Sequence, residues 1–359
     1  MVTSTQIKSK GFAVYRRKDK MKCHLIPESG RFYKANMHMH TTVSDGVGSP
    51  EEIKKAYIDA GYSIVAYSDH EVLVEHNDLT DKNFLAITSF EKTINKRTEK
   101  TYSHMTTAHL NFFAKDPNNI SLSVLNPETA WGNAKNYITE EMKKFAYKAE
   151  YSAEGLNDVI KRANDEGFLV TLNHPVWSLE NYDDYKDLKG LWGIEVYNTA
   201  SDLEGYPDTV QPFEDLLRKG ERLYPLCTDD AHKPYDRFGG FIMIKADKLE
   251  YKTIMTALEK GDFYASTGPS IYDIAVEDNI LSVKCSDAVT VSFITDRRRN
   301  QQKTWDGETT MTEATFDMTK FLEDSVLTDT PAPYFRIAVK DKSGRIAYSR
   351  AYFLDEIIK

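Results

Sequence analysis

Residues 37–46 read Met-His-Met-His-Thr-Thr-Val-Ser-Asp-Gly, which places two histidines and a carboxylate close together in the chain. His38 and His40 are two residues apart, so on a β-strand both side chains leave the same face, about 7 Å apart at the Cα atoms. That separation suits two imidazoles that bind one cation. Asp45 follows where the strand should give way to a loop, and its carboxylate can reach the same place. The stretch therefore predicts a metal site lined by histidines and carboxylates.

Further along the chain, short apolar stretches lead into polar residues in the same way. Residues 63–67, 168–172 and 223–227 are apolar, and they lead into His70, His174 and the pair Asp230 and His232. Helical segments separate these stretches. Ser49 and Pro50 predict the start of one helix, and Gly61 predicts its end. This alternation favours a sheet of parallel βα units, open or closed into a barrel, with the polar residues at the carboxyl ends of the strands.

The pattern changes near residue 266. Short strand-like runs bounded by turn formers such as Asp278-Asn279 predict a small antiparallel β-sandwich at the C-terminus. Residues 115–150 are rich in turns and then helical, and we interpret them as a candidate cap insertion over the strand ends. The predicted division is an N-terminal extension at 1–35, a main domain at 36–265 and the sandwich at 266–359.

The charge balance restricts the class of partner. Lysine and arginine number 46 against 55 acidic residues, which gives a net charge of −9. A chain this acidic is a poor candidate for dedicated binding of duplex nucleic acid, which requires a basic surface. A small phosphorylated substrate remains compatible, because bound divalent metals dominate the local field.

The cysteines and the hydropathy pattern bear on the compartment. Cys23, Cys227 and Cys285 are far apart and odd in number, which argues against a disulfide framework and fits a reducing compartment. The sequence shows neither a secretory signal nor a membrane span, so we expect a cytoplasmic protein with no membrane partner.

Four motifs in a fixed order resemble the PHP (polymerase and histidinol phosphatase) superfamily. They are His38-x-His40-Thr41 continuing to Gly46, Ser68-Asp69-His70, Asn173-His174-Pro175 and Asp230-Ala231-His232. The resemblance covers about residues 36–265. It implies an α/β fold, a distorted (β/α)7 TIM-like barrel that carries two or three divalent metals. The layout with a C-terminal sandwich resembles the carbaryl-hydrolase-like branch of the superfamily.

The resemblance also implies a set of metal ligands. The set is His38, His40, Asp45, His70, Glu91, His109, His174, Asp230 and His232. In the implied sharing, His38, His40, Glu91 and Asp230 hold one metal, and Glu91 bridges to a second held by His109 and His174. Asp45, His70 and His232 hold a third. Mixed nitrogen and oxygen ligation suits zinc, manganese or iron. Glu91, Asp230 and His232 are also expected to act in catalysis.

Two histidines compete for one of these positions. His104 and His109 both lie near the expected place, and His109 is favoured because His-Leu-Asn-Phe-Phe at 109–113 resembles the family's histidine followed by an apolar run. His24 and His76 are interpreted as structural or surface residues.

The leading functional hypothesis is a metal-dependent phosphoesterase that hydrolyses a small phosphomonoester through a metal-bridging hydroxide. Lys233 and Arg237 follow the last motif and are the expected phosphate-binding cations, with Asn198 at the exit of strand 192–198 as a third substrate contact. The alternative is a hydrolase of carboxylic or carbamate esters or amides, because the same chemistry attacks a carbonyl. A third hypothesis is a non-catalytic metal-binding module.

Overall fold

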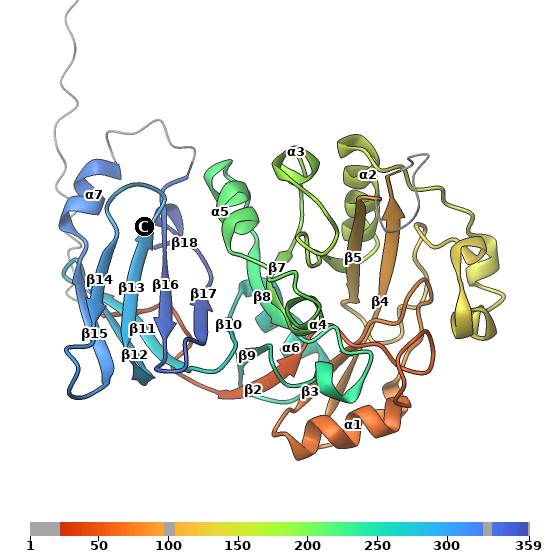
Figure 1. The fold of residues 1–359 in the computed structure, drawn as a ribbon, viewed down its shortest axis with the longest axis horizontal. Coiled ribbons are helices and arrows are strands. Elements are labelled where there is room, and N and C mark those ends of the chain that lie inside the picture. The colour runs from red at the N-terminus through yellow and green to blue at the C-terminus, as the bar shows by residue number, and fades with distance from the viewer. Residues whose placement is uncertain (1–21, 97–104, 326–331, 358–359) are drawn as a thin grey trace, which may run out of the picture.

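The computed structural model describes residues 22–96, 105–325 and 332–357 as a mixed α/β chain built around one large sheet (Figure 1). The strands up to residue 266 are β1 (Cys23–His24), β2 (Arg31–Asn36), β3 (Ile64–Tyr67), β4 (Leu85–Asn95), β5 (Thr107–Ala114), β6 (Phe168–Leu172), β7 (Gly193–Asn198), β8 (Tyr224–Thr228), β9 (Phe241–Ala246) and β10 (Phe263–Ser266). The later strands are β11 (Ile271–Glu277), β12 (Ile280–Ala288), β13 (Thr290–Thr295), β14 (Gln301–Thr304), β15 (Met311–Asp317), β16 (Tyr334–Lys340), β17 (Ile346–Ser349) and β18 (Tyr352–Phe353).

Helices connect and cover these strands. The α-helices are α1 (Pro50–Asp59), α2 (Ala153–Asp165), α3 (Tyr182–Tyr185), α4 (Thr199–Leu203), α5 (Gln211–Arg218), α6 (Tyr251–Lys260), α7 (Thr319–Ser325) and α8 (Leu354–Ile357). Short 3₁₀ helices are η1 (Asn77–Leu79), η3 (Pro127–Thr129), η4 (Gly132–Tyr137), η5 (Met142–Lys144) and η6 (Pro234–Asp236). No described helix is long and apolar enough to cross a membrane.

The predicted helix starts are present. Ser49 caps α1 in a capping box with Glu52, and Pro50 occupies the first turn, where its missing N–H costs nothing. This fixes the direction of α1, whose buried residues Ile53 and Tyr57 pack beneath the sheet. Ser152 caps α2 in the same way by accepting a hydrogen bond from the backbone of Gly155.

The large sheet has the order β14-β13-β16-β17-β10-β9-β2-β3-β4-β5-β6-β7-β8, with β18 beside β16. β2, β3 and β4 are parallel, and so are β6, β7 and β8. β5 runs antiparallel to both of its neighbours. The predicted parallel pairing is thus present in two groups of three strands, and β5 brings its N-terminal half to the carboxyl-terminal half of β4.

A closed barrel is not confirmed, because the described sheets are open. Closure would require β2 to pair with β8. One side of β2 is instead paired with β3 and the other with β9, so no edge of β2 is free for β8. The two ends of the barrel-like part meet at a single isolated bridge between Met39 and Ala231, just beyond β2 and β8. This bridge lies between the His38–His40 segment and the segment of Asp230 and His232, so it joins two segments that together carry four of the nine predicted ligands.

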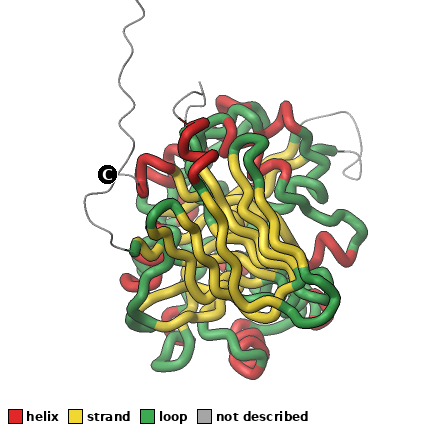
Figure 2. The backbone as a smooth tube through the Cα atoms, turned by 90° about the vertical axis from the view of Figure 1, so that its left-hand side faces the viewer, coloured by secondary structure: helices red, strands yellow, loops and turns green. Residues whose placement is uncertain are grey.

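A separate C-terminal sandwich is not confirmed, because the strands after residue 266 belong to two different sheets. β11, β12 and β15 form a four-stranded sheet with β1 from the N-terminal region. β13, β14, β16 and β17 instead continue the large sheet, because β17 pairs with β10. Both sheets supply one core cluster, with Val283 on one side and Phe293 and Phe335 on the other. Figure 2 shows these strands side by side at the front. The domain boundary near residue 266 stays a prediction.

Candidate metal centre

The predicted ligands come from six strands of the large sheet or the loops that follow them. His38 and His40 follow β2, Asp45 lies in the loop before α1, and His70 follows β3. Glu91 lies within β4 and His109 within β5, while His174 follows β6 and Asp230 and His232 follow β8. All of them except Asp45 and His232 are buried. The structure therefore gathers all nine predicted ligands into one cluster, and their role as ligands stays a prediction.

The first ligand group combines His38, His40, Glu91 and Asp230. The Nε2 atoms of the two histidines are 3.2 Å apart, and Asp230 Oδ1 lies 3.1 Å from that of His38 and 2.9 Å from that of His40. The Glu91 oxygens lie 3.3 and 3.4 Å from these same nitrogens. Four potential ligand atoms thus converge on one point.

The second group shares Glu91 with the first. Glu91 Oε1 lies 3.1 Å from His109 Nδ1 and 3.4 Å from His174 Nε2. Asn173 donates to the same oxygen at 2.8 Å and so fixes its direction. The antiparallel course of β5 explains the position of His109, because the register sets it opposite Thr93, two residues beyond Glu91. His104 lies outside the described residues.

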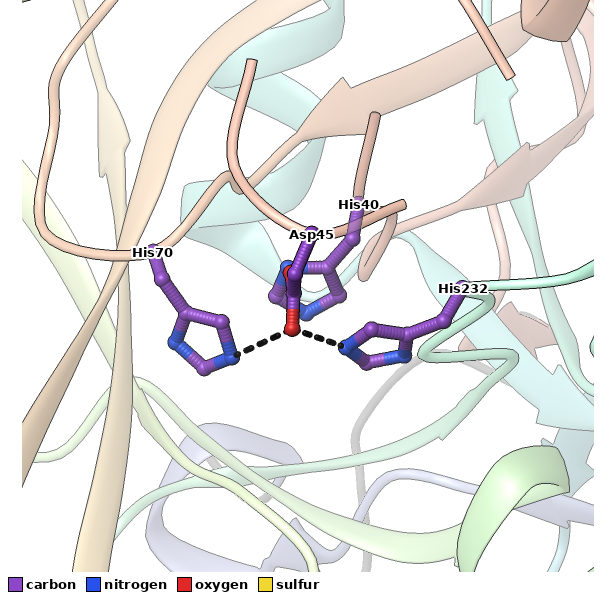
Figure 3. Close-up of side chains that lie close together, drawn as sticks. All are labelled: His40, Asp45, His70 and His232. Atoms are coloured by element: carbon purple, nitrogen blue, oxygen red, sulfur yellow. Dashed lines mark ion pairs between the residues drawn. The ribbon is translucent and has the colours of Figure 1, made fainter. Parts of the chain in front are cut away.

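The third group contains His40, Asp45, His70 and His232, which point toward one another (Figure 3). Asp45 Oδ2 lies between the rings, 3.2 Å from His232 Nε2 and 3.9 Å from His70 Nε2. His40 turns its Nδ1 to the other oxygen of Asp45 at 3.5 Å. The sequence placed His40 in the first group alone, whereas here its two ring nitrogens face two groups.

These distances and the unsatisfied atoms fit divalent cations. Ligand atoms bound about 2.0–2.2 Å from one tetrahedral cation are roughly 3.4 Å from each other, close to the spacing in the first group. His40 Nδ1, Glu91 Oε2 and Asp230 Oδ1 are buried without a hydrogen-bond partner. Buried polar atoms are nearly always satisfied, so these atoms indicate a missing partner of opposite charge. The nitrogen and oxygen donors suit zinc, manganese or iron.

The electrostatics of the cluster also favour a cation at its centre. Burial alone would lower the pKa values of His174 and His232, but the neighbouring Glu91, Asp230 and Asp45 raise both to about 9. Burial would likewise raise the pKa values of Glu91 and Asp230, yet the surrounding histidines hold both well below the usual range. The carboxylates therefore stay ionised beside these histidines, and a metal cation would take the place of the imidazolium protons.

Glu195 is a buried residue of the centre that the sequence analysis did not single out. Its Oε1 accepts hydrogen bonds from His38 Nδ1 and from the hydroxyl of Thr228, both at 2.8 Å. Its Oε2 accepts from the backbone N–H of His174 and from the amide of Asn198, both at 2.9 Å. A carboxylate that orients a metal-binding histidine is a common outer partner of metal sites. The signal was present in the sequence as an acid inside the apolar strand 192–198.

Two predicted ligands have strained backbones. His174 has φ +25° and Asp230 has φ +52°, in the left-handed region that side chains other than glycine rarely occupy. Each strained residue is held by a backbone hydrogen bond, from His174 N–H to Glu195 and from Asp230 N–H to the carbonyl of His38. Strain of this kind concentrates where geometry serves function.

A pocket of about 940 Å³ opens onto the cluster. Its wall includes Thr129 and Trp131, so the predicted cap segment 115–150 does reach the strand ends. Lys233 is exposed and lines this pocket. Arg237 is not among the lining residues, and its guanidinium lies beside Gly48.

Asn198, the third predicted substrate contact, lies beside the ligand cluster. Its side chain is fully buried, and its amide donates to Glu195 and, at 3.2 Å, to Asp230 Oδ2. Its oxygen accepts a hydrogen bond from the backbone of Ser201. Because both amide hydrogens are directed at carboxylates, Asn198 can position these carboxylates, and its role as a substrate contact stays a prediction.

Comparison with known proteins places the chain near PHP-like structures. No family model matches the chain, and no curated protein matches it. A two-domain protein containing a predicted PHP-like metal-dependent phosphoesterase from Bacteroides vulgatus ATCC 8482 is 14% identical with a TM-score of 0.43, over 91% of this chain and 98% of that one.

Two further structures have other described activities. An amidohydrolase from Chromobacterium violaceum is 14% identical over 64% of this chain and 96% of that one, with a TM-score of 0.39. The lesion-specific endonuclease PfuEndoQ from Pyrococcus furiosus is 14% identical over 64% of this chain and 56% of that one, with a TM-score of 0.39. The solved structures to which the chain is similar thus include a predicted PHP-like metal-dependent phosphoesterase. Because these TM-scores are low, we draw its function from its own side chains.

Proposed function

We propose that this chain is a metal-dependent phosphoesterase that hydrolyses a small phosphomonoester at a site for two or three divalent cations. One observation carries this proposal: the first group shares Glu91 with the second and His40 with the third, so the three ligand groups lie side by side. Adjacent cations can contact several oxygens of one phosphoryl group, which neither cation could do alone.

The charge of the site supports an anionic substrate. The three groups contain three carboxylates, Asp45, Glu91 and Asp230, while the other ligands are imidazoles that bind metals in their neutral form. With the buried Glu195 behind His38 the centre holds four carboxylates, and three divalent cations carry more positive charge than these four can neutralise. The filled site therefore attracts an anion such as a phosphate ester.

Bound divalent cations lower the pKa of coordinated water and polarise ester oxygens. The chain's own residues supply the rest. Glu91 holds the first two groups in register, and Glu195 and Asn198 orient His38 and Asp230 from behind. His232 lies at the pocket wall, where the leaving group would depart, and Lys233 on the rim can hold a phosphoryl oxygen.

Hydrolysis of a carboxylic or carbamate ester or amide is the second candidate. The observation that favours it is the shortage of cationic side chains, since Lys233 is the one lysine or arginine among the described residues that line the pocket. A neutral ester does not need such side chains.

A screen of metal-reconstituted protein separates these candidates. Protein loaded with zinc, manganese or iron is assayed against phosphomonoesters, phosphodiesters and aryl esters, with metal content measured in parallel. We expect at least two metals per chain, phosphomonoester turnover, inhibition by inorganic phosphate and a lower melting temperature after chelation. Turnover of aryl esters alone, without phosphate inhibition, would favour the second candidate. Full metal content without any turnover would indicate a non-catalytic module.

A further inference from the structure

Two tryptophans stand over the ligand cluster inside the pocket. The Trp131 ring lies 5.4 Å from that of His70, and the Trp177 ring lies 5.1 Å from that of His174. His70 and His109 are themselves 5.5 Å apart, and Trp177 also lies 5.4 Å from His109. The two indoles therefore cover adjacent members of the cluster, and both line the pocket.

Trp131 is exposed although its surroundings are well fixed. Its side chain is 44% exposed, and it precedes η4 of the cap segment. The neighbouring Thr129 donates a hydrogen bond to Glu71 at 2.6 Å, and Asn133 donates to the carbonyl of Thr42 at 3.2 Å. Ala130 and Ala134 pack in a small core cluster beneath. The indole is thus presented to the pocket from an anchored segment, with nearly half of its surface exposed.

Trp177 is also fixed in place, and it lies beside His109 and His174. Its Nε1 donates a hydrogen bond to Glu204 at 2.8 Å, which fixes the plane of the ring. Leu203 and Tyr235 add two more exposed apolar or aromatic side chains to the same pocket wall, 59% and 66% exposed. An apolar wall around a metal centre favours an apolar group of the ligand, because burial of both surfaces removes them from water.

We propose that the pocket selects esters whose leaving group carries a flat, uncharged aromatic ring, which packs on Trp131 and Trp177 while the ester group reaches the metal centre. This rests on the proposed ester hydrolysis at that centre. Aromatic rings prefer offset or edge-to-face contacts, which indole faces offer and a saturated ring cannot reproduce. Of the two acids beside the indoles, Glu71 is already paired with Lys92 at 3.3 Å and Glu204 accepts the indole N–H of Trp177, so a cationic ring is not the partner that we expect.

Three phosphate esters with primary alcohol leaving groups test this proposal. Phenethyl, cyclohexylethyl and ethyl phosphate differ in the ring but have leaving groups of closely similar acidity. We expect kcat/KM to be highest for phenethyl phosphate. Trp131→Leu should reduce the preference for phenethyl over cyclohexylethyl phosphate on the order of 3- to 10-fold, and Trp131→Phe should restore part of it. The matched control is Trp305→Leu. Trp305 follows β14 and packs against Lys342 away from the pocket, so this variant should keep the preference for phenethyl phosphate.

Binding distinguishes a failure of this inference from a failure of the proposed function. Calorimetry on the metal-loaded protein compares phenethylphosphonate with ethylphosphonate, which cannot be hydrolysed as esters. A ring preference that Trp131→Leu reduces supports the inference even if no phosphate ester is turned over, in which case the phosphoesterase assignment alone fails. Equal affinity for the two phosphonates, or equal kcat/KM for the phenethyl and cyclohexylethyl esters, would overturn it.

Discussion

The carboxylate of Glu195 lies 2.8 Å from Nδ1 of His38, and both side chains are fully buried. An ionised carboxylate only accepts hydrogen bonds, so His38 carries a proton on Nδ1, which leaves Nε2 as the nitrogen that a metal in the first ligand group would bind. The other oxygen of Glu195 accepts from the backbone of His174, a residue of the second group. One side chain thereby sets the geometry of two groups.

Replacement of Glu195 tests this role. Both oxygens of Glu195 accept hydrogen bonds. In Glu195→Gln an NH2 group replaces one of these oxygens, and it cannot accept the hydrogen bonds that the oxygen received. We expect metal affinity to fall by roughly 10- to 100-fold, the usual effect of losing such a partner. Metal titration by calorimetry measures this effect, with the exposed Glu277→Gln as control. Unchanged affinity would mean that Glu195 is only a core residue.

The bridging position of Glu91 predicts an effect on two metals at once. Glu91→Gln removes a charge that both the first and the second group share, so we expect a loss of more than one metal per chain and a large loss of activity. Elemental analysis of the purified variant provides the measurement. His24→Ala, which removes a histidine paired with Asp273 outside the cluster, should retain full metal content. Similar losses in both variants would place the bridging acid elsewhere.

Lys233 and Arg237 should differ in their effect on substrate binding. Lys233 lines the pocket and Arg237 does not. Lys233→Ala should therefore raise KM for a phosphomonoester several-fold, on the order of 3- to 10-fold, with a smaller effect on kcat. Arg237→Ala should leave KM nearly unchanged. Steady-state kinetics of the two variants measure these KM values. A larger rise in KM from Arg237→Ala than from Lys233→Ala would contradict the assignment of Lys233 as the phosphate contact.

Glu180 predicts a pH dependence of stability. Burial raises the pKa of its carboxyl to about 8, from a usual value of 4.5. The folded chain therefore holds a proton that the unfolded chain has lost, and this contribution to the free energy of unfolding falls as the pH rises from 4.5 to about 8. Glu180→Gln should lose less stability across this range than the native chain. Urea unfolding at several pH values measures it, with the exposed Glu308→Gln following the native curve.

The ligands that the strand pattern predicts are those at the ends of parallel strands. His70, His174 and Asp230 follow apolar stretches, where the period of the sequence marks the strand and the next polar residue marks its end. His109 could be assigned only by family resemblance, because it lies inside an antiparallel strand. The rule that ligands follow the ends of parallel strands does not apply to β5, because β5 runs antiparallel to its neighbours and its own end lies at the opposite edge of the sheet.

The features that the sequence did not predict depend on packing between distant segments. Strand alternation does not specify closure, and here β9 occupies the edge of β2 that a closed barrel would need. Arg237 follows the Asp230-Ala231-His232 motif and Asn198 ends a predicted strand. The direction of each side chain nevertheless depends on neighbours that are distant in sequence, such as Gly48 for Arg237. Such choices arise only once the tertiary contacts exist.

The pairing of β10 with both β9 and β17 limits how the chain can be shortened. A chain ending near residue 266 would leave the β17 side of β10 as a bare, apolar edge that invites intermolecular strand addition. It would also remove Tyr334 and Arg336, which hydrogen-bond the buried carboxylate of Glu214 in α5. The half that carries the ligand cluster would therefore aggregate when produced alone, and assays of this protein call for both halves in one polypeptide.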